Sequence, residues 1–118
     1  MARFLPVALA SIVGGSIAFA DPAVAKPYIY VTSGTYNGTA IECMNNVKPV
    51  LSRLQFGNFE SNQSNDKRIT KISGYHNDEY VTVEVECDQK LGITAVGVAG
   101  LDNKLTFDLY NKVINAKW

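Results

Sequence analysis

Apolar residues recur every three or four positions over residues 39–57, and this spacing predicts a helix. Thr39 and Glu42 form the T-x-x-E pattern of a capping box, which favours a helix that starts at Thr39. Gly57 is suited to end this helix. Pro49 predicts a kink or break near Asn45, one turn before the proline, because proline has no N–H to donate. The apolar stripe consists of Ile41, Met44, Val47, Leu51 and Leu54.

The apolar period changes to two over residues 80–88, which indicates a strand with one buried face. One face carries Val81, Val83, Val85 and Cys87, and the opposite face carries Tyr80, Thr82, Glu84, Glu86 and Asp88. Residues 93–99 predict the next strand after a turn at 89–92. On that strand one face is small, with Ile93, Ala95, Gly97 and Ala99, and the other carries Thr94, Val96 and Val98.

The small face of the strand predicted over residues 93–99 is expected to point inward, because small side chains let a helix approach a sheet closely. Val96 and Val98 then lie on the outer face with Tyr80, and such an apolar strip is a candidate contact surface. It is a surface through which a homodimer could form. The alternative is that the domain covers both faces of the sheet.

The remaining segments complete an α+β pattern. Residues 28–33, 56–61 and 67–75 predict strands, residues 61–66 a polar loop, and Asp102 an N-cap with a final helix behind it. The expected fold is a single antiparallel sheet of about four to five strands with two helices packed on one face, in the order β-α-β-β-β-β-α.

The first 20 residues have the features of a cleaved secretory signal peptide. Arg3 gives a positive start, about fifteen uncharged apolar residues follow, and Ala18-Phe19-Ala20 is a small-x-small cleavage pattern. A second such pattern ends at Ala25, so cleavage after Ala20 or Ala25 stays open. Removing 20 of the 118 residues leaves 98, which we expect to form a single domain (21–118) that is exported to the periplasm or the extracellular space, with no membrane span after cleavage.

The two cysteines are the most interpretable pair in the chain. Cys43 lies beside the apolar stripe of the predicted helix, and Cys87 lies on the core side of the predicted strand. Two thiols within reach of each other form a disulfide in an oxidising compartment, so we predict a Cys43–Cys87 bridge. A redox-active pair is the alternative, but there is no C-x-x-C motif to lower a thiol pKa.

Charge adds one candidate site and excludes one class of partner. Eleven Lys and Arg balance eleven Asp and Glu, so there is no basic field of the kind that binds nucleic acid. Glu84, Glu86 and Asp88 form an acidic patch on one strand face, where they could bind a cation or a basic partner. The stronger interpretation is cross-strand pairing with Lys67, Arg68 and Lys71, and we predict no metal site.

Enzyme chemistry has few candidate residues. His76 is the single histidine and stands in a polar segment predicted to turn, and the common hydrolase, metalloprotease and nucleotide-binding motifs do not occur. We therefore predict no catalytic residue and no cofactor. Asn37 and Asn62 stand in formal glycosylation sequons, which matter only if the host glycosylates asparagine.

In layout the chain resembles small exported bacterial proteins of uncharacterised families. The resemblance rests on a signal peptide, on the segments Glu42-Cys43-Met44 and Val85-Glu86-Cys87-Asp88, and on the helix start at Ala99-Gly100-Leu101-Asp102. It implies no catalytic residue.

The leading hypothesis is an exported, non-enzymatic binding protein for a protein or small ligand in the cell envelope. An inhibitor or immunity factor of an exported enzyme, which would use the acidic face or residues 61–66, is the second. A small hydrolase that uses His76 with Asp78 or Glu79 is the third.

Overall fold

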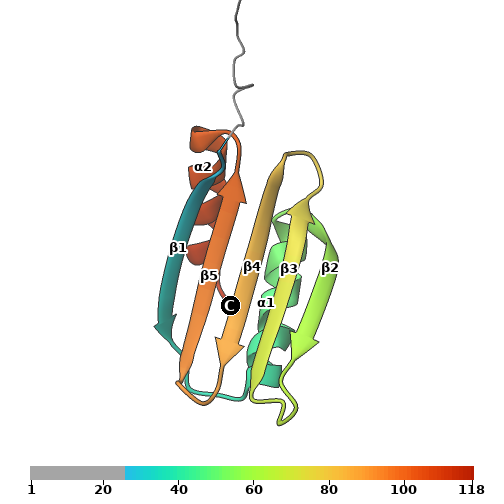
Figure 1. The fold of residues 1–118 in the computed structure, drawn as a ribbon, viewed down its shortest axis with the longest axis vertical. Coiled ribbons are helices and arrows are strands. Elements are labelled where there is room, and N and C mark those ends of the chain that lie inside the picture. Colours follow the sequence, from blue (N-terminus) through green and yellow to red (C-terminus); the bar gives the residue numbers. More distant parts are fainter. Residues whose placement is uncertain (1–25) are drawn as a thin grey trace, which may run out of the picture.

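The computed structural model describes residues 26–118, and the predicted signal peptide with its cleavage sites lies outside this range. The expected α+β order is confirmed in Figure 1. The elements are β1 (Tyr28–Thr35), α1 (Ala40–Arg53), β2 (Phe56–Gln63), β3 (Ile69–His76), β4 (Val81–Asp88), β5 (Ile93–Gly100) and α2 (Asn103–Ile114).

The five strands form one antiparallel sheet in the order β1-β5-β4-β3-β2. Both helices lie on one face of the sheet, α1 against β2, β3 and β4, and α2 against β5 and β1 (Figure 1). The chain passes from β1, at one edge of the sheet, through α1 to β2 at the opposite edge, and β5 returns to pair with β1. Each helix therefore covers a different part of the sheet. Within residues 26–118 the opposite face carries no helix, and we call it the outer face.

Helix α1 starts where the capping box predicts. The Thr39 hydroxyl accepts from the Glu42 N–H at 3.1 Å, and the Glu42 carboxylate accepts from the Thr39 N–H at 3.0 Å. The predicted break is wrong, because the helix runs continuously through Pro49 and three of its flanking residues, Val47, Val50 and Leu51, are buried against the sheet. Burial of this stripe outweighs the loss of one helical hydrogen bond.

The predicted end of α1 at Gly57 is also wrong. The helix ends at Arg53, and the chain reverses through Gln55, which adopts a left-handed φ of 73°. Gly57 instead belongs to β2, a strand that continues to Gln63. The first half of the predicted loop at 61–66 is thus paired with β3, and the chain turns only after Ser64.

The orientation of β5 corrects the predicted contact strip. Val83 and Val85 pair with Val98 and Val96, and paired residues lie on the same face of a sheet. Val96 and Val98 are therefore in the core, with 6% and 1% of their surface exposed, while the small residues face outward. The strip of Tyr80, Val96 and Val98 does not exist as a surface.

The core lies between the sheet and the two helices. Valines from β4 and β5 form its floor, and α1 contributes more buried side chains than α2. Its members are Ala40, Cys43, Val47, Leu51, Phe56, Ile72, Val81, Val83, Val85, Cys87, Val96, Val98, Leu109 and Val113.

Helix α2 is capped by Asp102, whose carboxylate accepts from the Leu105 N–H at 2.8 Å, as predicted. It is held to β1 by aromatic contacts: the Tyr30 ring lies 5.1 Å from Phe107 and 5.6 Å from Tyr110, measured between ring centroids. Within residues 26–118, no helix has the length and apolarity needed to cross a bilayer.

Candidate functional site

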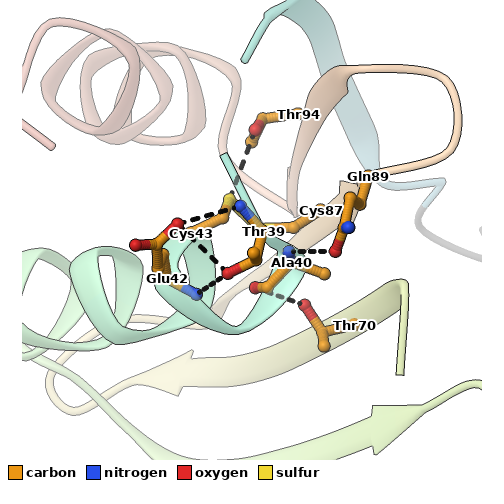
Figure 2. The surroundings of a disulfide bond; sticks show 8 residues. All are labelled: Thr39, Ala40, Glu42, Cys43, Thr70, Cys87, Gln89 and Thr94. Atoms are coloured by element: carbon orange, nitrogen blue, oxygen red, sulfur yellow. Dashed lines mark hydrogen bonds between the residues drawn. A yellow bond between two sulfur atoms is a disulfide. The ribbon is translucent and has the colours of Figure 1, made fainter. Parts of the chain in front are cut away.

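The predicted disulfide between Cys43 and Cys87 is confirmed. It joins α1 to β4 across 44 residues of sequence, and both cysteines are buried in the core. Thr94 on β5 lies against it, with its hydroxyl oxygen 3.3 Å from the Cys43 sulfur (Figure 2). Since both sulfurs are bonded to each other, no thiol is left for chemistry.

Two further hydrogen bonds fix the first turn of α1 to the sheet, as Figure 2 shows. The Ala40 N–H donates to the Gln89 side chain at 3.1 Å, and the Thr70 hydroxyl donates to the Ala40 carbonyl at 3.2 Å. Gln89 comes from the turn after β4, and Thr70 from β3. The helix start is therefore tied to β3, β4 and the β4–β5 turn, and this rigid corner supports the neighbouring pocket.

A pocket of about 530 Å³ opens beside this corner, between α1 and the C-terminal end of α2, and we call it the interhelix pocket. The second half of β1 and the start of β5 form its floor, where α2 no longer covers the sheet. It is lined by Thr32, Ser33, Gly34, Thr35, Tyr36, Cys43, Asn46, Thr94, Val96, Ile114 and Trp118.

Among residues 26–118, the side chains that line the interhelix pocket are uncharged. Its lining offers two aromatic rings, several hydroxyl groups and the carboxamide of Asn46, with no Asp, Glu, Lys, Arg or His. The Trp118 indole N–H is already used, since it donates to the Val113 carbonyl at 3.0 Å, and the side chain is 39% exposed. The ring is thereby held in place with part of its surface available for a flat apolar partner.

The acidic patch lies on the outer face of β4. Lys71 is opposite Glu86 in the β3–β4 register, and its ammonium nitrogen lies 3.9 Å from the Glu84 carboxylate. Asp88 accepts from the Leu91 N–H at 3.0 Å and so braces the β4–β5 turn. Of the three predicted basic partners only Lys71 lies opposite the acids, because Lys67 and Arg68 belong to the turn before β3.

A metal role for these acids finds no support in the described part of the chain. Within residues 26–118, no three potential metal ligands among His, Cys, Asp and Glu come together. Glu84 is instead partly neutralised by Lys71, and Asp88 is used in the turn.

His76 ends β3 rather than forming a turn. Its ring packs edge-on against Phe56 at 5.2 Å, and its Nδ1 accepts from the Asp78 N–H at 3.2 Å. Near it, Tyr80 is 91% exposed and borders a second open pocket of about 600 Å³ at the β3–β4 turn. His76 thus stabilises this turn, and the contact between Asp78 and His76 is made by the Asp78 backbone N–H.

Most of the interhelix pocket escapes sequence reasoning. Trp118 is noticeable in the sequence as a terminal aromatic residue, but Tyr36, Asn46 and Thr94 belong to a loop, a helix and a strand that meet only after folding. One signal was present: β1 changes from aromatic and aliphatic to hydroxyl-bearing residues at Thr32. That change marks the point where the floor of the pocket begins.

Comparison of the chain with family models, with curated proteins and with solved structures finds no match in any of the three.

Proposed function

We propose that this protein is a small exported, non-enzymatic binding protein that takes an uncharged ligand in the interhelix pocket. The observation that carries the proposal is the lining itself, which combines aromatic rings and hydroxyl groups with no charged side chain. A charged ligand would lose its hydration there without gaining an ion pair with a lining side chain. A neutral ligand carries no charge that needs such a partner. Convergent polar groups beside an apolar wall are typical of small-molecule sites.

The lining also suggests the ligand's shape. Trp118 offers part of a ring face, and Thr32 and Asn46 offer hydrogen-bond donors and acceptors on the other sides. A ring with hydroxyl groups on its edge and C–H groups on its face fits both, and neutral sugars have this chemistry. The disulfide is consistent with an oxidising compartment such as the periplasm or the extracellular space, where free sugars and glycans occur.

Fluorescence of Trp118 tests the proposal directly, because it is the only tryptophan in the chain. The oxidised protein is titrated with glucose, galactose and maltose, and in parallel with glucuronate and glucosamine as charged counterparts of similar size. We expect a saturable change with at least one neutral sugar and a weaker response to the charged ones. Equal responses to neutral and charged sugars, or no response to any, would contradict the proposal.

Variants locate the site. Asn46→Ala removes a lining carboxamide and is expected to weaken binding about tenfold, the effect of losing one hydrogen bond. Asn62→Ala on β2 is the matched control, since it removes the same group from an exposed position far from the pocket. His76→Ala is expected to leave binding unchanged.

A further inference from the structure

The two edges of the sheet differ in how they meet solvent. Edge strand β2 is interrupted by a bulge between Gly57 and Glu60, with Asn58 at a left-handed φ of 53°, and it carries the charge of Glu60. Edge strand β1 pairs with β5 without interruption along all eight residues and carries no charge and no proline. Bulges and charges are the usual devices that stop an edge from pairing with another strand, and β1 has neither. The Tyr110 hydroxyl of α2 donates to the Val31 carbonyl over a long 3.5 Å, a weak contact that a strand–strand hydrogen bond would replace.

The side chains in the first half of β1 are larger than those in the second half. On the helix-facing side, Tyr28 and Tyr30 are followed by Thr32 and Gly34; these four pair with Gly100, Val98, Val96 and Thr94 of β5. On the outer face, Ile29 and Val31 are followed by Ser33 and Thr35. The first half of the strand is therefore bulky on both faces and the second half is small.

We propose that β1 pairs antiparallel with β1 of a second copy of this chain, about a twofold axis at Val31. This register sets Tyr30 opposite the partner's Thr32, and Tyr28 opposite the partner's Gly34. On the outer face Ile29 meets the partner's Ser33, and Val31 meets the partner's Val31. The bulky half thus meets the small half on each face, and no like charges oppose each other.

The pairing also has a consequence for the interhelix pocket. Gly34 borders this pocket, and a side chain built at its position would meet no atom within 4 Å. In the dimer this space lies beside the partner's Tyr28, so the partner subunit adds an aromatic wall to the open border of the pocket. Only this consequence rests on the proposed function, since the pairing itself depends on β1 alone.

The test is the mass of the oxidised protein by sedimentation equilibrium over about 10 to 500 µM, a range suited to a weak strand-edge interface. We expect the wild type to reach the dimer mass and Val31→Lys to stay monomeric, because two ammonium groups would meet on the axis. Val31 is 68% exposed, so this variant is expected to fold. Asn62→Lys on the opposite edge is the matched control and is expected to dimerise like the wild type.

Crosslinking checks the register. Val31→Cys places two thiols on the axis and is expected to form an intermolecular disulfide, whereas Ser33→Cys separates them and is expected not to. A wild type that is monomeric at every concentration overturns the proposal, as does a dimer that Val31→Lys leaves intact. Crosslinking through Ser33→Cys alone overturns the Val31 axis. Sugar titration of the monomeric Val31→Lys variant tests the proposed function independently of dimer formation. If this variant still binds the sugar, the proposed function holds whatever the outcome for the dimer.

Discussion

The α1 half of the molecule, made of α1 with β2, β3 and β4, is held differently from the α2 half, made of α2 with β1 and β5. Helix α1 is bonded covalently to the sheet and anchored by Thr70 and Gln89 at its first turn. Helix α2 has no covalent link and depends on a small buried stripe and on the aromatic contacts of Tyr30. The first half is closed, while the second leaves part of the sheet uncovered.

The proposed binding site lies where the two halves meet. The interhelix pocket lies at the boundary of the two halves, with the rigid corner of α1 on one side and the less covered strands β1 and β5 on the other. The free edge proposed to pair with a second copy also belongs to the α2 half. Regions with few buried contacts open most easily, so the α2 half is where we expect adaptation to a ligand.

Removing the disulfide has the largest expected effect on this comparison. In the Cys43→Ala/Cys87→Ala variant the unfolded chain regains the entropy of a loop closed over 44 residues, and the free energy of unfolding falls by about 4 kcal/mol. Urea denaturation measures it, and reduced wild type is the control that should match. A loss below about 1 kcal/mol would show that the covalent link of the α1 half contributes little to the stability of the protein.

Core truncation compares the two helices directly. Leu51→Ala in α1 and Leu109→Ala in α2 remove the same atoms from buried positions. We expect a loss of about 4 kcal/mol for Leu51, where the anchored helix cannot collapse into the cavity, and about 2 to 3 kcal/mol for Leu109, where α2 can shift. Urea denaturation gives both values, and a larger loss at Leu109 would contradict the proposed difference.

The N-caps provide a smaller contrast. Thr39→Ala and Asp102→Ala each remove a side chain that accepts from a backbone N–H, and each is expected to cost about 1 kcal/mol. Hydrogen bonds from the Thr39 backbone N–H and then from its hydroxyl lower the pKa of Glu42. Thr39→Ala removes only the hydroxyl, so it should raise that pKa part of the way toward its ordinary value. Amide hydrogen exchange at Leu105 should rise more than at Glu42, because the first turn of α1 keeps its other anchors. The reverse order would count against the comparison.

The smallest expected effect concerns the β2–β3 turn in the α1 half. The Ser64 hydroxyl, the Lys90 ammonium group and the Arg68 N–H all bond to Asp66 and hold its pKa well below the ordinary value. The carboxylate therefore stabilises the fold above its unfolded pKa of about 3.9, and this contribution is lost as the pH falls further toward the folded pKa. Asp66→Asn should be slightly less stable than wild type at about pH 7.

Urea midpoints at several pH values check this dependence. The gap between wild type and Asp66→Asn should narrow steadily once the pH drops below about 4. A gap that is independent of pH would mean that the amide and the carboxylate serve the turn equally well, and that its bonds to Asp66 do not depend on charge.

Local patterns were sufficient for much of this fold. The capping box of Thr39 and Glu42, the N-cap at Asp102 and the order of the elements follow from neighbouring residues, because caps and periodicity are properties of short segments. The Cys43–Cys87 bridge followed from two such segments, each with its cysteine near a core face. What failed were the break at Pro49, the end of α1, the extent of β2 and the faces of β5.

These failures have one cause. Which face of β5 is buried depends on how Val96 and Val98 align with Val85 and Val83, and that register is a property of two strands and the turn between them. The interhelix pocket likewise exists only because α1, α2, β1 and β5 meet around it. The sequence by itself determined the elements, their order and the bridge, since these depend on local spacing. Tertiary packing decided which residues face the core, which face solvent and where the interhelix pocket opens.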